Sequence, residues 1–185
     1  IFLFLPAVVT IFWLATEKLS LKFVVLWLVL SSLFYYSWWA PKYLTLILLS
    51  IVCNYFWGNI LFKRKSKIIL SSAILMNLLV LGYFKYTDFF IENINHILGS
   101  DIETIQVLLP LAISFFTFQQ IAYLIDTYHG KAYKYGFMRF ALYVSFFPQL
   151  IAGPIVYHKE MMPQFSNNLL KLNFSNINLG IFIFS

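Results

Sequence analysis

Long apolar stretches alternate with short charged segments along the whole chain. A helix needs about 20 apolar residues to cross the hydrocarbon of a bilayer, within a range of about 17 to 25. Dividing the chain at its charged residues predicts six membrane spans and the start of a seventh. The predicted spans are residues 1–16, 23–40, 43–62, 68–84, 104–125 and 140–157, followed by 179–185. This pattern predicts an all-α fold, a polytopic transmembrane helical bundle within a single membrane domain covering residues 1–185.

One segment between spans has a different pattern. From residue 88 to residue 103, apolar residues such as Phe90, Ile94 and Ile97 recur at helical spacing, while acidic and amide residues take the other face. An amphipathic pattern of this kind is typical of a helix that lies in the membrane interface. We expect Gly99 to end that helix.

The composition agrees with a membrane protein. The chain is 61% hydrophobic and 11% charged, with a mean hydropathy of +0.80, whereas soluble domains average about 25% charged residues. The composition therefore excludes an ordinary soluble enzyme and a disordered chain. The chain has a single cysteine, Cys53, so an intrachain disulfide is excluded. Because the chain opens at Ile1 rather than Met and stops within an apolar run at Ser185, we expect a piece of a longer protein.

The basic residues predict an orientation. The net charge is +6, and the Lys63 to Lys67 cluster is typical of a cytoplasmic loop facing anionic lipid. Alternation of spans then places nine of the 13 basic residues inside, which are Lys18, Lys22, Lys63, Arg64, Lys65, Lys67, Lys131, Lys134 and Arg139. Lys42, Lys85, Lys159 and Lys171 fall outside. We expect a multi-pass protein of the cytoplasmic membrane with its N-terminus outside, and a lipid bilayer rather than nucleic acid as partner.

Polar side chains concentrate in the fifth predicted span. The polar residues there are Ser114, Thr117, Gln119, Gln120 and, at the end, Asp126. Gln119, Tyr123 and Asp126 lie on one helix face because they are four and seven residues apart, and we expect that face to avoid lipid. Two interpretations stay open: the glutamines tie neighbouring helices together while the hydroxyls bond to their own helix, or these residues line a polar path.

The sixth predicted span contains helix breakers. Pro148 and the Gly153-Pro154 pair are six residues or fewer apart, so we expect a broken or re-entrant helix there. Irregular backbone at membrane depth occurs where it is buried in protein or lines a cavity. Gln149 lies between the breaks and offers both a donor and an acceptor to such a cavity. The alternative is a packing helix with a simple proline kink.

The histidines form no recognisable site. His96, His129 and His158 fall in or near predicted loops and lack metal-ligand spacing, so we expect three solvated loop histidines and no metal. Phosphate-binding glycine loops, zinc clusters and nucleophile elbows are also absent from the sequence.

Taken together, these segments resemble the membrane-bound O-acyltransferase family, in the branch that O-acetylates alginate or transfers D-alanine to teichoic acid. The resemblance extends over nearly the whole chain in order, and it includes residues 32–44, 77–86, 109–126, 143–155 and 159–165. The most specific stretch runs from Tyr143 to Ile155. Two positions depart from the family pattern. The family usually has arginine at the position of His129, and arginine or histidine at the position of Tyr157. These departures put the substrate or partner preference in question.

The resemblance implies an activity. An acyl group, most simply acetyl, would pass from a cytoplasmic thioester donor, either an acyl carrier or acetyl-CoA, to a hydroxyl of a cell-envelope polysaccharide such as alginate. It also implies an extracytoplasmic polysaccharide-modifying partner and no bound cofactor. The family's catalytic histidine would lie beyond Ser185, so we expect no catalytic residue in this chain and no activity from it alone.

Eight residues are our candidates for lining the acyl path: Ser114, Thr117, Gln119, Asp126, Pro148, Gln149, Gly153 and Pro154. D-alanyl transfer to teichoic acid is an alternative activity. A transporter subunit is another, because a broken helix with a mid-membrane amide is also typical of transport sites, and a membrane scaffold without chemistry is a third.

Overall fold

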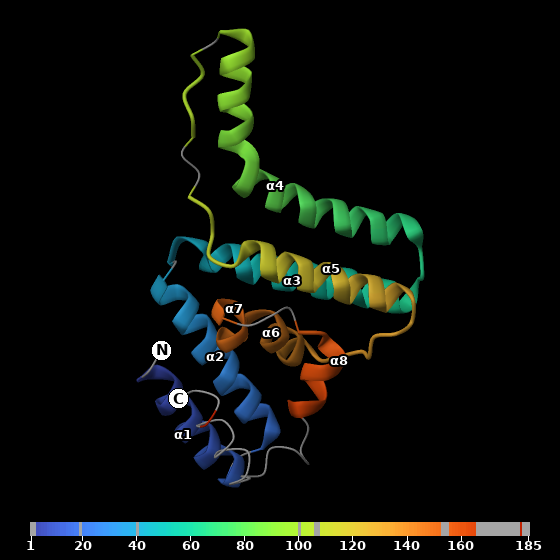
Figure 1. Cartoon of the computed structure of the whole chain (residues 1–185). Helices are drawn as coiled ribbons and strands as arrows, with labels where there is room; N and C mark the ends of the chain where they lie inside the picture. Colours follow the sequence, from blue (N-terminus) through green and yellow to red (C-terminus); the bar gives the residue numbers. More distant parts are fainter. Residues whose placement is uncertain are drawn as a thin grey trace.

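The computed structural model describes residues 3–18, 20–39, 41–99, 101–105, 108–152, 156–165 and 182, and it is all-α over these residues (Figure 1). The helices are α1 (Phe4–Lys18), α2 (Leu21–Trp39), α3 (Leu44–Lys63), α4 (Lys67–Leu98), α5 (Ile113–Tyr128), α6 (Phe137–Ser145), α7 (Phe147–Ala152) and α8 (His158–Met161). Short 3₁₀ turns cover Pro41–Tyr43 and Met162–Phe165. The predicted fold class is confirmed.

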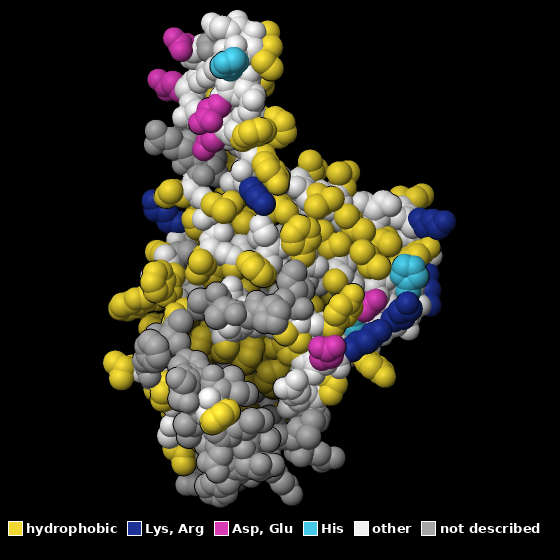
Figure 2. Space-filling model, in the orientation of Figure 1, with side chains coloured by type: hydrophobic (Ala, Val, Ile, Leu, Met, Phe, Trp, Pro, Cys, Tyr) yellow, Lys and Arg dark blue, Asp and Glu magenta, His cyan; other side chains and the backbone are white. Residues whose placement is uncertain are grey.

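Three of the described helices are long and apolar enough to cross a bilayer. They cover Leu21–Trp39, Pro41–Lys63 and Lys67–Leu98. Large apolar side chains stay exposed on the outer faces of α3 and α4, among them Leu49, Phe56 and Leu79, and Figure 2 shows such side chains over much of the surface. Lipid, unlike water, tolerates such a surface. The number of spans beyond these three stays a prediction.

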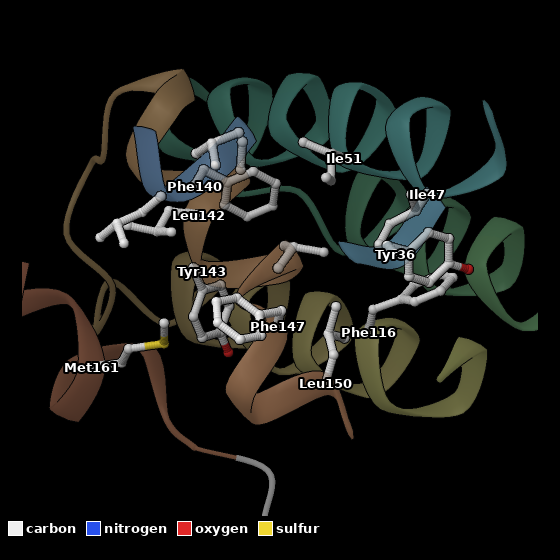
Figure 3. Close-up of a cluster of buried hydrophobic side chains, with 14 of the residues drawn as sticks. Tyr36, Ile47, Ile51, Phe116, Phe140, Leu142, Tyr143, Phe147, Leu150 and Met161 are labelled. Atoms are coloured by element: carbon white, nitrogen blue, oxygen red, sulfur yellow. The ribbon is translucent and has the colours of Figure 1, made fainter. Parts of the chain in front are cut away.

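The central packing unit consists of α3, α5 and the first half of α4, which run side by side (Figure 1). Its main apolar cluster joins α2, α3 and α5 to α6 and α7, and Figure 3 shows Tyr36, Ile47, Phe116 and Phe140 within it. A small residue permits one close approach: a Cβ at Gly58 of α3 would lie 2.9 Å from Cε1 of Tyr123 on α5. Close backbone approach at small residues is how helices associate in lipid.

Helix α4 corrects one boundary. The predicted span 68–84 and the predicted interfacial helix from residue 88 form one helix of 32 residues. Figure 1 shows this helix bending so that its second half runs across the direction of α3 and α5, as an interfacial helix would. Gly82 and the Thr87 hydroxyl, which donates to the Tyr83 carbonyl, weaken the regular helix near the bend. Gly99 ends the helix with φ at +60°, as predicted.

Helix α5 is shorter than the predicted span 104–125. It begins at Ile113 and has 16 residues, because Pro110 lacks an N–H and Ala112 takes a left-handed conformation with φ of 58°. Residues 101–105 and 108–110 are irregular instead. Two tyrosine hydroxyls donate hydrogen bonds to backbone carbonyls of the segment before α5. Tyr36 of α2 donates to the Leu111 carbonyl at 3.2 Å, and Tyr43, in the turn before α3, donates to the Leu108 carbonyl.

The sixth predicted span, 140–157, does not cross as one helix. Helix α6 ends at Ser145, α7 ends at Ala152, and α8 returns to the place where α6 began. The rings of Tyr135, just before α6, and His158, at the start of α8, have centroids 6.0 Å apart. The chain therefore enters through α6 and returns at α8 to the same end of α5, and we name residues 137–152 and 156–161 the re-entrant hairpin. This is the re-entrant form of the predicted break.

Charge separates between the two ends of the bundle. Most of the basic side chains gather at the end where α3 passes to α4 and α5 passes to α6 (Figure 2), and Gly130 lies directly against Lys65 there. We name this the basic end. The acidic side chains at the opposite extreme belong to the arm formed by the second half of α4 and the residues after it. Lys159 lies at the basic end, 3.8 Å from Asp126, so its predicted outside position relative to Lys131 and Lys134 is wrong.

Candidate functional site in the re-entrant hairpin

The break in the hairpin follows from one proline. Pro148 has no N–H, and in a continuous helix its ring would clash with the carbonyl of Val144. The chain turns at Phe146 instead, with φ of −56° and ψ of 106°. The Phe146 carbonyl then accepts the N–H groups of Gln149 at 3.1 Å and Leu150 at 3.0 Å, which starts α7. The predicted break is confirmed at Pro148; Gly153 and Pro154 lie outside the described residues.

Helix α2 supports this break. The backbone N–H of Phe147 would otherwise lose its partner, and it donates to the hydroxyl of Ser32 at 3.3 Å. Ser32 is fully buried in α2. An orphaned N–H away from water costs about as much as a lost hydrogen bond, so this hydroxyl is part of what allows the chain to break inside the protein.

Gln149 carries unused hydrogen-bonding capacity inside the hairpin. Its side chain is half-buried, and its Nε2 atom is buried without an acceptor in the part of the chain that the structure describes. A buried amide left in this state costs about 1–3 kcal/mol. It is therefore a donor available to a polar group that enters beside α7.

A buried histidine and a half-buried carboxylate close the hairpin. Nε2 of His158 lies 3.0 Å from Oδ2 of Asp126, and Nζ of Lys159 lies 3.8 Å from the same oxygen. His158 is fully buried, so the prediction that it is a solvated loop histidine is wrong. His96 and His129 are both exposed, as predicted, but His96 lies within α4 rather than in a loop.

Three tyrosines enclose the imidazole of His158. The ring centroids of Tyr123, Tyr135 and Tyr143 lie 5.5, 6.0 and 6.2 Å from it, each presenting edge-on geometry. Burial lowers the pKa of His158, while the hydrogen bond to Asp126 acts in the opposite direction. Because the Asp126 carboxylate can only accept, Nε2 carries a proton and donates it to Oδ2. Because the ring has no exposed surface, this pair holds the hairpin in place and is closed to substrate in this conformation.

The predicted shared face of α5 is the face that the hairpin covers. The hydroxyl of Tyr143 donates to the backbone carbonyl of Gln119 at 3.4 Å, and the rings of Tyr123 and Phe140 are 4.9 Å apart. The expectation that this face avoids lipid is confirmed. Gln119 is itself buried, and its Oε1 atom has no donor among the described residues.

A second polar cluster joins α3, α4 and α5 on another face of the bundle. The side chains of Asn54 and Asn77 donate to each other at 3.0 and 2.7 Å. Oε1 of Gln120 accepts from Asn54 at 2.6 Å and from Ser50 at 2.7 Å. The expectation that a glutamine ties neighbouring helices is therefore confirmed for Gln120. Sequence reasoning overlooked Asn54, although an isolated amide in an apolar span is itself a signal for such a contact.

The remaining candidate path residues lie in different places. Thr117 is buried beside a cleft of about 210 Å³ that Ser50, Asn54 and Asn77 also line, and Ser114 is half-buried one turn earlier. Pro148 lies against a separate apolar cavity of about 160 Å³ lined by α1. These candidates therefore do not share one surface. Thr117 lines the cleft, Pro148 lines the apolar cavity, and Gln119 lies on the face of α5 that the hairpin covers. Among the residues that the structure describes, no group of three or more metal-ligating side chains comes together.

Comparison with curated proteins finds relatives across the whole chain. It is 45% identical to a peptidoglycan O-acetyltransferase of Helicobacter pylori, in a 216-residue alignment that covers 100% of this chain and 41% of that protein. It is 34% identical over 177 residues to a probable alginate O-acetylase, AlgI, of Pseudomonas aeruginosa, covering 90% of this chain and 33% of the relative. The corresponding protein of Pseudomonas syringae is 33% identical.

The chain spans less than half the length of these relatives. No family model matches the chain, and no solved structure matches it. The relatives confirm the resemblance drawn from the sequence motifs.

Proposed function

We propose that this chain, which belongs to the membrane-bound O-acyltransferase family, is part of an enzyme that acetylates hydroxyls of a cell-envelope polysaccharide. The observation that carries the proposal is the 45% identity to a peptidoglycan O-acetyltransferase, which extends over the whole chain. It includes the re-entrant hairpin and the polar face of α5 that the hairpin covers. The proposed location is the cytoplasmic membrane.

We favour peptidoglycan over alginate as the acceptor. The identity to the peptidoglycan enzyme is 45%, against 34% for the alginate enzyme of Pseudomonas aeruginosa, and the alignment covers 100% rather than 90% of this chain. The acyl group would be acetyl, as in the names of these relatives. The donor would be a cytoplasmic thioester, either acetyl-CoA or an acyl carrier, and an extracytoplasmic partner would complete the transfer.

The role we assign to the hairpin is to form part of the wall of the acyl path. The unpaired Nε2 of Gln149 offers a hydrogen bond to the carbonyl oxygen of the travelling acyl group. A donor aimed at an oxygen that gains negative charge during acyl transfer lowers the barrier most when water is excluded. None of the three histidines described here is assigned as the base, since two are exposed and His158 is enclosed.

The test measures ester-linked acetate released by mild base from purified peptidoglycan. Deleting the gene should remove this acetate, and the full-length gene should restore it. Gln149→Ala in the full-length protein should lower it about tenfold or more, the loss expected for one well-placed donor. Gln164→Ala is the matched control, because Gln164 is exposed and its Nε2 donates to the Glu160 carbonyl.

Three outcomes count against parts of this proposal. Acetate that survives the deletion would overturn the activity. A loss confined to another envelope polymer would overturn the acceptor. Equal acetate in the Gln149→Ala and Gln164→Ala strains would remove Gln149 from the path.

A further inference from the structure

A cavity at the basic end is not used by the proposed transfer. It lies between the beginnings of α2 and α6 and has a volume of about 490 Å³, within the range of about 300 to 1,000 Å³ that is typical of ligand pockets. Leu21, Val25, Phe137 and Met138 form apolar walls, and Lys22 and Arg139 add two positive charges. None of the described residues that line it is acidic.

Both cations lie where a helix already carries positive potential. Lys22 is the second residue of α2 and Arg139 is the third residue of α6. The N-terminus of a helix has a partial positive charge, so cations there are unfavourable and anions are favourable. Neither helix has an acidic residue in its first turn to compensate.

Helix α6 also has backbone donors to offer. Its N-cap is Gly136, which has no side chain to accept a hydrogen bond from the first turn. The first N–H groups of a helix have no acceptor within the helix and are satisfied by capping side chains, water or ligands. Two helix N-termini and two cationic side chains therefore converge on one apolar-walled cavity.

We propose that this cavity binds the phosphate group of an anionic phospholipid. The phosphate oxygens would accept hydrogen bonds from Nζ of Lys22, from the guanidinium of Arg139 and from the first N–H groups of α6. The apolar walls would hold the glycerol and the first carbons of an acyl chain. A bound anion would also neutralise the unfavourable charges at the two helix N-termini.

Two observations favour lipid over a soluble phosphate. Helix α2 is long and apolar enough to span the membrane, and the cavity lies at its end, the level at which headgroups lie. Four apolar side chains line the cavity, and a free inorganic phosphate would leave them in contact with water. The basic end is also the end predicted to face the anionic leaflet.

The test is native mass spectrometry of the full-length protein released from nanodiscs that contain phosphatidylglycerol and phosphatidylethanolamine. The wild type should retain phosphatidylglycerol in preference. The double variant Lys22→Gln with Arg139→Gln should retain about tenfold less or lower still. The matched control, Lys131→Gln with Lys134→Gln, removes two exposed cations at the same end and should retain the wild-type amount.

Thermal unfolding gives a second readout that a misfolded variant would not mimic. Phosphatidylglycerol should raise the midpoint of the wild type and of the control, because a ligand of the native state stabilises it, and should not raise that of the cavity variant. Without anionic lipid, the cavity variant should be at least as stable as the wild type, since two unfavourable charges are gone.

Equal retention of phosphatidylglycerol by the cavity variant and the control would overturn the proposal. So would equal retention of the zwitterionic lipid by the wild type. If inorganic phosphate or coenzyme A displaces the lipid from the wild type and also raises the midpoint through Lys22 and Arg139, the site serves soluble phosphates and the lipid assignment is wrong.

Discussion

The contact between Asp126 and His158 should decide whether the re-entrant hairpin stays closed. Asp126→Ala removes the acceptor of a fully buried imidazole whose Nε2 lies 3.0 Å from the carboxylate. Leaving one buried donor unpaired costs about 1–3 kcal/mol. Lys159 contributes little to this sum, because its side chain is 41% exposed and 3.8 Å from the carboxylate and exposed ion pairs contribute about 0–1 kcal/mol.

The assay is hydrogen exchange of the hairpin amides in the full-length protein in nanodiscs. A loss of about 1–3 kcal/mol corresponds to exchange that is roughly five- to 150-fold faster through local opening. Asp126→Asn keeps an oxygen acceptor and should show a smaller increase. Glu160→Ala removes an exposed carboxylate two residues from His158 and serves as the matched control. Unchanged exchange in Asp126→Ala, or the same increase in Glu160→Ala, would refute the reasoning.

Three further predictions concern the pH dependence and the packing of the bundle. Burial holds the pKa of His158 below its ordinary value of 6.5. The closed hairpin should therefore be most stable above about pH 6.5 and should open more readily as the pH falls below that value. His158→Gln should reduce this pH dependence in the same hydrogen-exchange assay. Gly58→Ala should lower the thermal midpoint because its Cβ would lie 2.9 Å from a ring on α5, whereas Gly82→Ala, with nothing within 4 Å, should be neutral or stabilising. Asn54→Ala should cost about 1–3 kcal/mol of stability in a thermal or denaturant assay, because it leaves the Asn77 amide without its partner. The double variant Asn54→Leu with Asn77→Leu leaves no amide of this pair unpaired and should cost less. A double variant less stable than Asn54→Ala would contradict this prediction.

Local chemistry made several features predictable. Pro148 cannot continue a helix, and α6 ends with its C-cap at Phe146, two residues before the proline. Gly99 ends α4 because glycine adopts a left-handed conformation without penalty. The polar face of α5 was predictable because lipid offers no hydrogen bonds to Gln119 and Asp126. Each of these inferences needs only the residue and its near neighbours in the sequence.

Contacts between distant residues were harder to predict. Asp126 and His158 are 32 positions apart, and His158 stands in a polar stretch that is typical of a loop. Only the return of the hairpin buries it. One signal was available: an acid at the end of an apolar span needs a partner, and the next basic residues after the broken helix are His158 and Lys159.

The predicted topology failed at the same place for the same reason. Alternation of spans assumes that each apolar stretch crosses the bilayer, and residues 140–157 are apolar enough to be counted. The break at Phe146 lets this stretch turn back instead. The prediction of a re-entrant segment and the prediction of an outside Lys159 were in conflict, and the structure favours the first.

The re-entrant hairpin is the central structural feature. Its return brings His158 to Asp126, and α7 within it carries Gln149, which we propose as part of the wall of the acyl path. Cysteine labelling with a membrane-impermeant thiol reagent tests it most directly, in full-length protein in which Cys53 is replaced by Ala. Cysteines placed at Lys134 and Lys159 should react from the same side of the membrane, and one at Lys85 from the opposite side. Labelling of Lys134→Cys and Lys159→Cys from opposite sides would show that the chain crosses the bilayer between these two positions, and it would contradict the re-entrant hairpin.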